Sequence, residues 1–206
     1  MLTAQDFIKL PITSWAIGVV FFRISETGVV EFANQRYTDT KRGGQVSTRL
    51  PLGTKEDIDE RVLDTLYREA REEMAKHPDR FDLELLDGFP VYAKLGEDYE
   101  RAGGVHLKAF FAAVAKGELR DFEKHDDGDI LGPIVFTEAS ELINRGPQGI
   151  PVFRTHLPAI LKTLSLLARL REVEDQYHLF LKRTNHLIPP DFTREERAKI
   201  EACLRR

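Results

Sequence analysis

The sequence predicts an α/β domain built on a mixed sheet and followed by a helical extension. Strand-like apolar runs dominate from Trp15 to about Phe136, and a single helix interrupts them. After Pro151 the apolar side chains instead recur every three or four residues, which is the period of a helix. We therefore expect one domain over residues 1–150 and a helical extension over residues 151–206.

The first two strands are predicted to form a hairpin. Residues 15–24 are a continuous apolar run, as expected for a strand covered on both faces. A turn at residues 26–28 leads to an antiparallel partner at residues 29–36. The polar stretch 38–48 contains Gly43 and Gly44 and is predicted to be a loop. Further strands are predicted at residues 83–94, 105–115 and 133–137.

The inserted helix is predicted over residues 58–76. Asp57 or Asp59 would cap its start, and Pro78 would end it. In the extension, residues 157–184 have helical apolar spacing, and Thr193 with Glu196 is a capping box for a last helix that ends near Arg205. This extension would cover the domain or form a subunit interface.

The composition is typical of a globular protein, with 206 residues, 42% hydrophobic and 31% charged. A net charge of -4 argues against a protein that coats nucleic acid, so no DNA partner is expected. The longest apolar runs, residues 15–22 and 109–115, are far shorter than the roughly 20 residues of a membrane span. The single cysteine, Cys203, excludes an internal disulfide framework and a cysteine-based zinc cluster. We therefore expect a cytoplasmic protein with no membrane partner.

Three acidic side chains share one face of the inserted helix. At about 100° per residue, Glu69, Glu72 and Glu73 lie within about a third of its circumference, beside the apolar stripe. Like charges three or four residues apart disfavour a helix by about 0.2–0.5 kcal/mol per pair, so their convergence invites a cation. Carboxylate oxygens are the ligands that Mg²⁺ and Mn²⁺ prefer. The alternative interpretation is a solvated helix face.

The spacing around these acids matches a known pattern. Glu60 is followed, seven residues on, by the run Arg-Glu-Ala-Arg-Glu-Glu at residues 68–73. Upstream lies Leu-Pro-Leu-Gly at residues 50–53, and the second strand ends in Gln-Arg at residues 35–36. The segment resembles the Nudix box, which is Gly, five residues, Glu, seven residues, and then Arg-Glu-apolar-x-Glu-Glu-x-Gly-apolar.

The sequence departs from the box at both ends. Six residues, not five, separate Gly53 from Glu60, and Leu52 stands where the first glycine usually is. Ala75 and Lys76 replace the closing Gly-apolar pair. The glutamates that bind metal in the family are all present.

The resemblance implies a Nudix-like α/β/α sandwich with a mixed β-sheet. It also implies Mg²⁺- or Mn²⁺-dependent hydrolysis of a phosphoanhydride bond in a nucleoside diphosphate-linked substrate. Glu69, Glu72 and Glu73 would bind the metal, and the main-chain carbonyl of Leu52 would add a ligand. Arg68 and Glu60 would orient these ligands. Glu72 or Glu73 would also accept the proton of the attacking water. Many members of the family pair, so the resemblance also implies a homodimer.

A further acid comes from a later loop in some members of the family. Glu123 is the candidate within the acidic stretch 121–129, with Asp126 and Asp127 as rivals. The alternative is a solvated turn. His125 lies in the same loop and is the one histidine of interest, because the six histidines show no ligand spacing.

Bases gather ahead of the box. Residues 36–49 contain only one acid, Asp39, and four bases, which are Arg36, Lys41, Arg42 and Arg49. Arg36, Arg42 and Arg49 are candidates to grip substrate phosphates, and Arg36 is best placed because it ends a strand. For Lys41 and Arg42 a solvated loop is the alternative.

Two classes of function follow. The intact glutamates favour a Nudix pyrophosphohydrolase, whose candidate substrates are ADP-ribose, dinucleoside polyphosphates, nucleoside triphosphates, capped RNA and coenzymes. The altered ends of the box would instead fit a catalytically inactive Nudix-fold module that binds a nucleotide or has a regulatory role.

Overall fold

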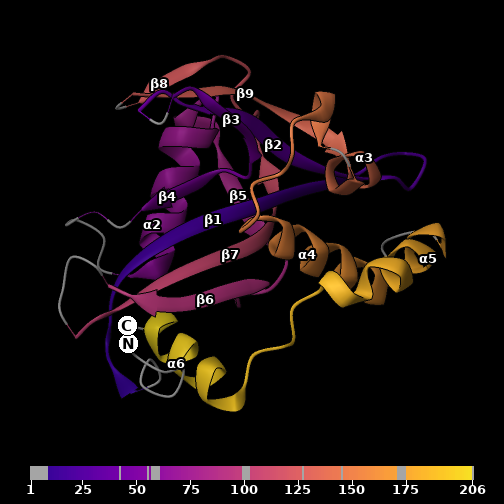
Figure 1. Ribbon diagram of the computed structural model, residues 1–206. Coiled ribbons are helices and arrows are strands. Elements are labelled where there is room, and N and C mark those ends of the chain that lie inside the picture. Colours follow the sequence, from indigo (N-terminus) through magenta and orange to yellow (C-terminus); the bar gives the residue numbers. More distant parts are fainter. Residues whose placement is uncertain are drawn as a thin grey trace.

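A nine-stranded mixed sheet forms the centre of the described part of the chain (Figure 1). The computed structural model describes residues 9–41, 43–54, 56, 61–98, 103–126, 128–144, 146–170 and 175–205. The strands run in the order β5-β7-β1-β2-β9-β8, with β3 beside β2, β4 beside β1 and β6 beside β7. The strands are β1 (Ile12–Ile24), β2 (Val30–Asp39), β3 (Gln45–Arg49), β4 (Leu52–Thr54), β5 (Asp82–Leu85), β6 (Tyr92–Glu97), β7 (Val105–Lys116), β8 (Lys124–Asp126) and β9 (Asp129–Glu138).

Helices cover both faces of this sheet. The α-helices are α2 (Val62–Glu69), α3 (Ala139–Asn144), α4 (Leu157–Arg169), α5 (Asp175–Thr184) and α6 (Arg194–Leu204). A π-helical turn, η1 (Ala70–Met74), continues α2 directly, and three short 3₁₀ turns are η2 (Pro78–Arg80), η3 (Pro147–Gly149) and η4 (Asn185–Leu187). Among the described residues, no helix combines the length and the apolar character needed to cross a bilayer.

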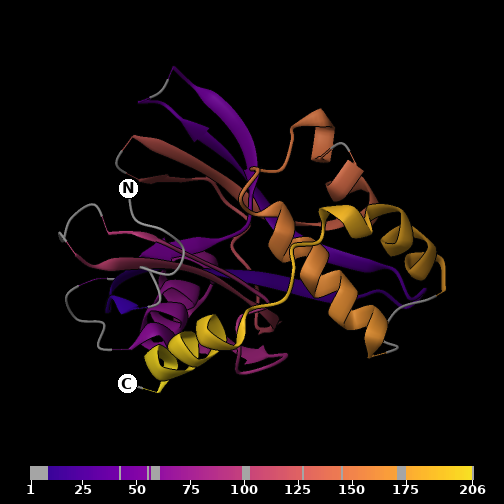
Figure 2. The ribbon, with the colours of Figure 1, turned by 60° about the horizontal axis from the view of Figure 1, so that its bottom comes forward.

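The sheet splits into two halves that share the β1–β2 hairpin. β7 runs parallel to β1 along one edge, whereas β4 and β2 both pair antiparallel with its other edge. β4 pairs with residues Ala16 to Gly18 of β1, and β2 pairs only with the end of β1, from Phe22 to Ile24. Beyond that end, β2 and its neighbours diverge from β1, as Figure 2 shows. The divergence leaves room for the segment that leads from β3 into β4.

Alternation along β1 separates two hydrophobic cores. Ile17 and Phe21 point to the face covered by α2, whereas Val20 and Phe22 point to the face covered by α4. Helix α6 lies beside α2 (Figure 2), and its Ile200 is buried in the first core. The helices after residue 150 thus pack against both faces of the sheet.

The structure corrects two strand predictions. Residues 38–48 are not a loop, because β2 continues to Asp39 and β3 pairs back onto it across a turn in which Gly43 and Gly44 have positive φ. β3 is polar and partly exposed, so it lacks the apolar alternation that reveals a strand. The single strand predicted over residues 83–94 is instead two strands, β5 and β6, which pair with different parts of β7.

The helix predictions are confirmed in kind but differ at their ends. Asp57 and Asp59 lie outside the described residues, and the inserted helix ends at Met74 because Ala75 is extended (ψ 140°) and bridges to Leu119. The capping box before α6 is confirmed, since the backbone N–H of Glu196 donates to the Thr193 hydroxyl (3.2 Å). The predicted helical stretch 157–184 contains α4 and α5.

Candidate functional site

The Glu69 carboxylate lies against the backbone of β4. The backbone N–H of Thr54 donates to Glu69 Oε1 (3.2 Å), and the residue is only 7% exposed. A Cβ at Gly53 would overlap the Glu69 carboxylate carbon, so only glycine permits this close approach. Burial raises the pKa of Glu69 to about 6, and the neighbouring Arg68 lowers it only in part.

Arg68 joins the acids of the helix to the preceding segment. Its guanidinium is 3.1 Å from a carboxylate oxygen of Glu56, 3.1 Å from one of Glu69 and 3.2 Å from one of Glu72. It also donates a hydrogen bond to the carbonyl of Thr54 (2.9 Å). One cation thus links the helix, β4 and Glu56.

The π-helical turn directs the last two glutamates to different partners. Glu72 pairs with Arg68 on the helix itself, and its side chain is 58% exposed. Glu73 pairs with Lys124 of β8, and its side chain is only 25% exposed. A π turn rotates the residues that follow relative to a regular α-helix, and such turns occur frequently at functional sites.

A buried arginine that the sequence did not suggest supports this end of the helix. Arg120 is 2% exposed, and its Nε donates to the carbonyl of Glu73 (3.0 Å). Its Nη2 donates to Gln35 Oε1 (2.8 Å), and its Nη1 donates to the carbonyl of Phe122. Burial lowers the pKa of this guanidinium. Arg120 therefore fixes the Glu73 backbone relative to β2 and to the segment that leads into β8.

Two predicted site residues line one cavity. Arg36 on β2 and Glu123 just before β8 share a cavity of about 340 Å³, together with Thr38, Ile130 and Gly132. Glu123 Oε1 is 3.1 Å from His125 Nε2, and the Glu123 side chain is 56% exposed. Of its rivals, the Asp126 side chain and the whole of Asp127 lie outside the described residues.

The predicted basic cluster is divided between two faces of the sheet. Arg36 pairs in register with Thr48, whereas Arg49 pairs with Gln35, so the two arginine side chains point to opposite faces. Arg49 stacks over Tyr37, with its Cζ 3.3 Å from the ring centroid.

The remaining predicted residues are placed as follows. Leu52 begins β4, directly before Gly53. Lys41 is exposed, and Arg42 and Glu60 lie outside the described residues.

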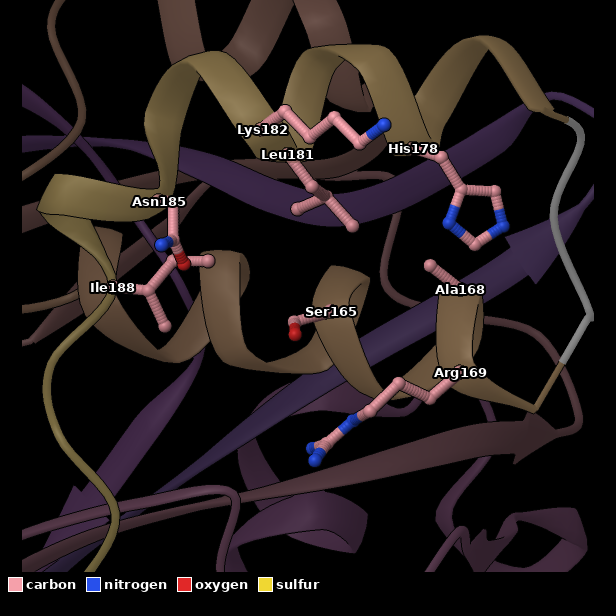
Figure 3. A pocket seen from close by; sticks show the side chains of 8 residues that line it. All are labelled: Ser165, Ala168, Arg169, His178, Leu181, Lys182, Asn185 and Ile188. Atoms are coloured by element: carbon pink, nitrogen blue, oxygen red, sulfur yellow. The ribbon is translucent and has the colours of Figure 1, made fainter.

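A different cavity lies within the helical extension. It has a volume of about 390 Å³ between α4 and α5, and Figure 3 shows Ser165 and Arg169 on one side and His178 and Lys182 on the other. None of the residues that line it is a site candidate from the sequence. Helix α4 lies on the opposite face of the sheet from α2. The cavity is therefore separate from the glutamates.

The donor set at the helix end fits a hard divalent cation in its chemistry. Glu69, Glu72 and Glu73 supply carboxylate oxygens within five residues, and Gly53 gives the first of them room at the loop backbone. In the described part of the chain, however, no three acidic, histidine or cysteine side chains converge closely enough to hold an ion. Glu72 is held by Arg68 and Glu73 by Lys124.

Several solved structures resemble this chain. The E. coli ORF135 protein is 16% identical, with 77% of this chain and 94% of that chain covered and a TM-score of 0.50. A C. elegans Ap4A hydrolase is 14% identical, with 76% and 98% covered and a TM-score of 0.49. A Nudix hydrolase from Nitrosomonas europaea is 14% identical, with 74% and 88% covered and a TM-score of 0.49. No protein-family model and no curated protein sequence matches the chain.

The structural likeness confirms the predicted fold. The chain has the Nudix-like α/β/α sandwich, with a mixed sheet between helical layers. At these identities the likeness shows the fold alone.

Proposed function

We propose that this chain is a metal-dependent pyrophosphohydrolase of the Nudix type. Its substrate is a nucleoside diphosphate linked to a further group, and the bond cleaved is a phosphoanhydride. The observation that carries the proposal is the fit of the Glu69 carboxylate over Gly53, with Glu72 and Glu73 following on the same helix end. This arrangement combines the box residues of the sequence with a Nudix-like fold.

In this proposal Glu69, Glu72 and Glu73 hold Mg²⁺ or Mn²⁺, and the main-chain carbonyl of Leu52 adds a ligand. A bound divalent cation would neutralise phosphate oxygens and lower the pKa of water. Arg68 orients Glu69 and Glu72 by its ion pairs, and Glu60 has the same orienting role.

The protein side chains supply the proton transfer and the phosphate contacts. Glu72 or Glu73 accepts the proton of the attacking water, and Glu123 is the further acid. Lys124 has to leave Glu73 before Glu73 can bind a cation or a proton. Arg36 lines the same cavity as Glu123 and contacts the substrate phosphates, and Arg42 and Arg49 are further substrate-binding candidates.

A hydrolysis screen tests this proposal. The purified chain is incubated with ADP-ribose, dinucleoside polyphosphates, nucleoside triphosphates, capped RNA and coenzymes, with Mg²⁺, with Mn²⁺ and without metal. We expect metal-dependent release of a nucleoside monophosphate or of phosphate from at least one substrate class. Absence of turnover across the whole panel with either metal would contradict the proposal.

The alternative is a module that binds a nucleotide without hydrolysing it. The ion pairs of Arg68 with Glu72 and of Lys124 with Glu73 favour this alternative, because they already neutralise both acids. Calorimetric titration with Mn²⁺ separates the two functions. Binding that is lost in Glu73→Gln supports the enzyme, whereas nucleotide binding without any Mn²⁺ binding supports the module.

We further propose that the chain is a cytoplasmic homodimer, with its domain over residues 1–150 and its extension over residues 151–206. The extension exposes large apolar side chains, namely Phe153, Leu170, Leu179 and Leu187. Light scattering at micromolar concentration is expected to give the mass of a dimer. A monomeric mass would contradict this part of the proposal.

A further inference from the structure

A second group of polar side chains, separate from the glutamates, lies where β7 meets the start of α4. Its centre is His156, which is 2% exposed. The backbone N–H of Leu50 donates to His156 Nδ1 (3.0 Å). A ring nitrogen that accepts a hydrogen bond carries no proton, so the proton of this imidazole is on Nε2.

His156 Nε2 faces another donor. It lies 3.5 Å from Lys108 Nζ, and an ammonium group can only donate. The two groups therefore point N–H donors at each other, and neither provides a hydrogen-bond acceptor for the other. Lys108 also donates to the Thr155 hydroxyl (3.0 Å), which leaves the hydroxyl proton free to point elsewhere. An acceptor placed beside these three groups would satisfy all of their N–H and O–H bonds.

The surroundings of Lys108 are positive. Lys94 stands directly opposite Lys108 on the neighbouring strand, an arrangement of like charges that disfavours the sheet. Arg49 and Lys108 lie near the same Phe153 ring, with Arg49 Cζ 4.4 Å and Lys108 Nζ 5.9 Å from its centroid. Among the described residues, no carboxylate forms an ion pair with any of these three cations, Arg49, Lys94 and Lys108.

Burial makes this uncompensated charge costly. The partial burial of Lys108, with Arg49 and Lys94 nearby, lowers its pKa to about 8. Burial and the neighbouring cations Lys108 and Arg49 hold the pKa of His156 well below its ordinary value. The positive end of helix α4 begins at the next residue, Leu157, and adds to the attraction for a negative group.

The position of this cluster relates it to the glutamate site. Lys108 pairs in register with Ala16 of β1, and Ala16 pairs with Thr54 of β4, whose N–H binds Glu69. Two strand spacings separate Lys108 from Thr54 at the backbone, or about 10 Å. Lys108 shares the α4 face of the sheet with Phe110, whereas Glu69 lies on the α2 face, so a molecule that reaches both has to pass around the other edge of β4, which pairs only with β1 among the described strands. A nucleoside diphosphate-linked molecule is long enough to do so.

We propose that Lys108, His156, Thr155 and Arg49 form an oxyanion site that binds a phosphate group of the substrate other than the metal-bound anhydride. This inference deepens the proposed function and rests on it for the identity of the molecule that carries the phosphate. The preferred substrates then carry a negative group at a distance from the cleaved bond.

Binding without metal tests the site independently of hydrolysis. Metal-free protein is titrated by calorimetry with inorganic phosphate, with AMP and with adenosine. We expect phosphate and AMP to bind and adenosine not to bind. Lys108→Met should weaken the AMP affinity at least about tenfold, which corresponds to about 1.4 kcal/mol. Lys116→Met, on the same strand but ion-paired with Glu84, should change it less than about twofold.

Thermal denaturation shows whether Lys108→Met has a folding defect. Without phosphate, Lys108→Met should melt at the same temperature as the wild type or higher, because a buried unpaired charge is removed. Added phosphate should raise the melting temperature of the wild type and not that of Lys108→Met. The assignment would be overturned if phosphate stabilised the wild type and Lys108→Met equally, or if adenosine bound the wild type as well as AMP does. It would also be overturned if the wild type bound no AMP, including the case in which it binds phosphate but not AMP. None of these outcomes depends on whether the chain hydrolyses a substrate.

Discussion

Glu69 approaches the backbone of Gly53 so closely that no other residue fits at position 53 without displacing the carboxylate. This contact links the loop half of the box to its helix half. It shows why a glycine is needed here even though the loop has one residue more than the family pattern. The relation between these two residues is the structural basis of the proposed metal site.

Gly53→Ala should therefore displace Glu69. We expect a loss of about 1–3 kcal/mol in the free energy of unfolding from the forced overlap, together with weaker Mn²⁺ binding. Urea denaturation and calorimetry measure the two effects. Gly88→Ala is the matched control, because a Cβ at Gly88 meets nothing within 4 Å. Equal behaviour of the two variants would show that the contact with Gly53 does not constrain Glu69.

Lys124→Met should strengthen metal binding. The Lys124 ammonium neutralises Glu73 and so competes with a cation for the same carboxylate. A partly exposed ion pair is worth about 0.2–1 kcal/mol, so removing it should tighten the Mn²⁺ dissociation constant by about two- to fivefold. Lys116→Met serves as the control. Weaker Mn²⁺ binding in Lys124→Met would mean that Lys124 supports the site instead of competing for it.

Arg120→Met should destabilise the fold more than any exposed substitution near the site. The change leaves the carbonyls of Glu73 and Phe122 and the amide oxygen of Gln35 without their donor. We expect a loss of about 3 kcal/mol or more in the free energy of unfolding, measured from urea denaturation midpoints. Arg71→Met, at an exposed position, should stay within about 0.5 kcal/mol of the wild type. A similar small effect at Arg120 would refute this supporting role.

Glu69→Gln should change how stability depends on pH. Burial raises the pKa of Glu69 to about 6, above its ordinary value of 4.5. Between these values the folded chain binds more protons than the unfolded chain, so the contribution of Glu69 to stability falls as the pH rises. The stability of Glu69→Gln relative to the wild type should therefore increase from pH 4.5 to 6 and level off above about pH 7. A difference that is constant over this range would argue against the raised pKa.

Much of the fold could be predicted from the sequence because its core elements have strong periodic signals. The apolar run of β1 and the capping box at Thr193 identify their elements directly. The hairpin of β2 and β3 escapes prediction because β3 is polar and its pairing depends on a turn with Gly43 and Gly44 at positive φ. The end of η1 at Met74 likewise depends on the pairing of Ala75 with distant Leu119, which no local sequence pattern indicates.

The site was only partly predictable for the same reason. The spacing of the glutamates placed them on one helix end, but it carried no information about the cations that hold them. Lys124 and Arg120 lie about 50 residues further along the chain and reach Glu73 only through the sheet. Arg36 and Arg49 looked like one cluster because sequence distance does not show that their strands direct them to opposite faces.

The most direct test of the proposed function is the rate of metal-dependent hydrolysis in single glutamate variants. With the best substrate of the panel and saturating Mn²⁺, Glu72→Gln and Glu73→Gln should each be slower than the wild type. Loss of the group that accepts the water proton should cost about 100-fold or more. Glu84→Gln, an exposed position paired with Lys116, should keep the wild-type rate. Wild-type turnover in both Glu72→Gln and Glu73→Gln would contradict the assignment of catalysis to this helix end.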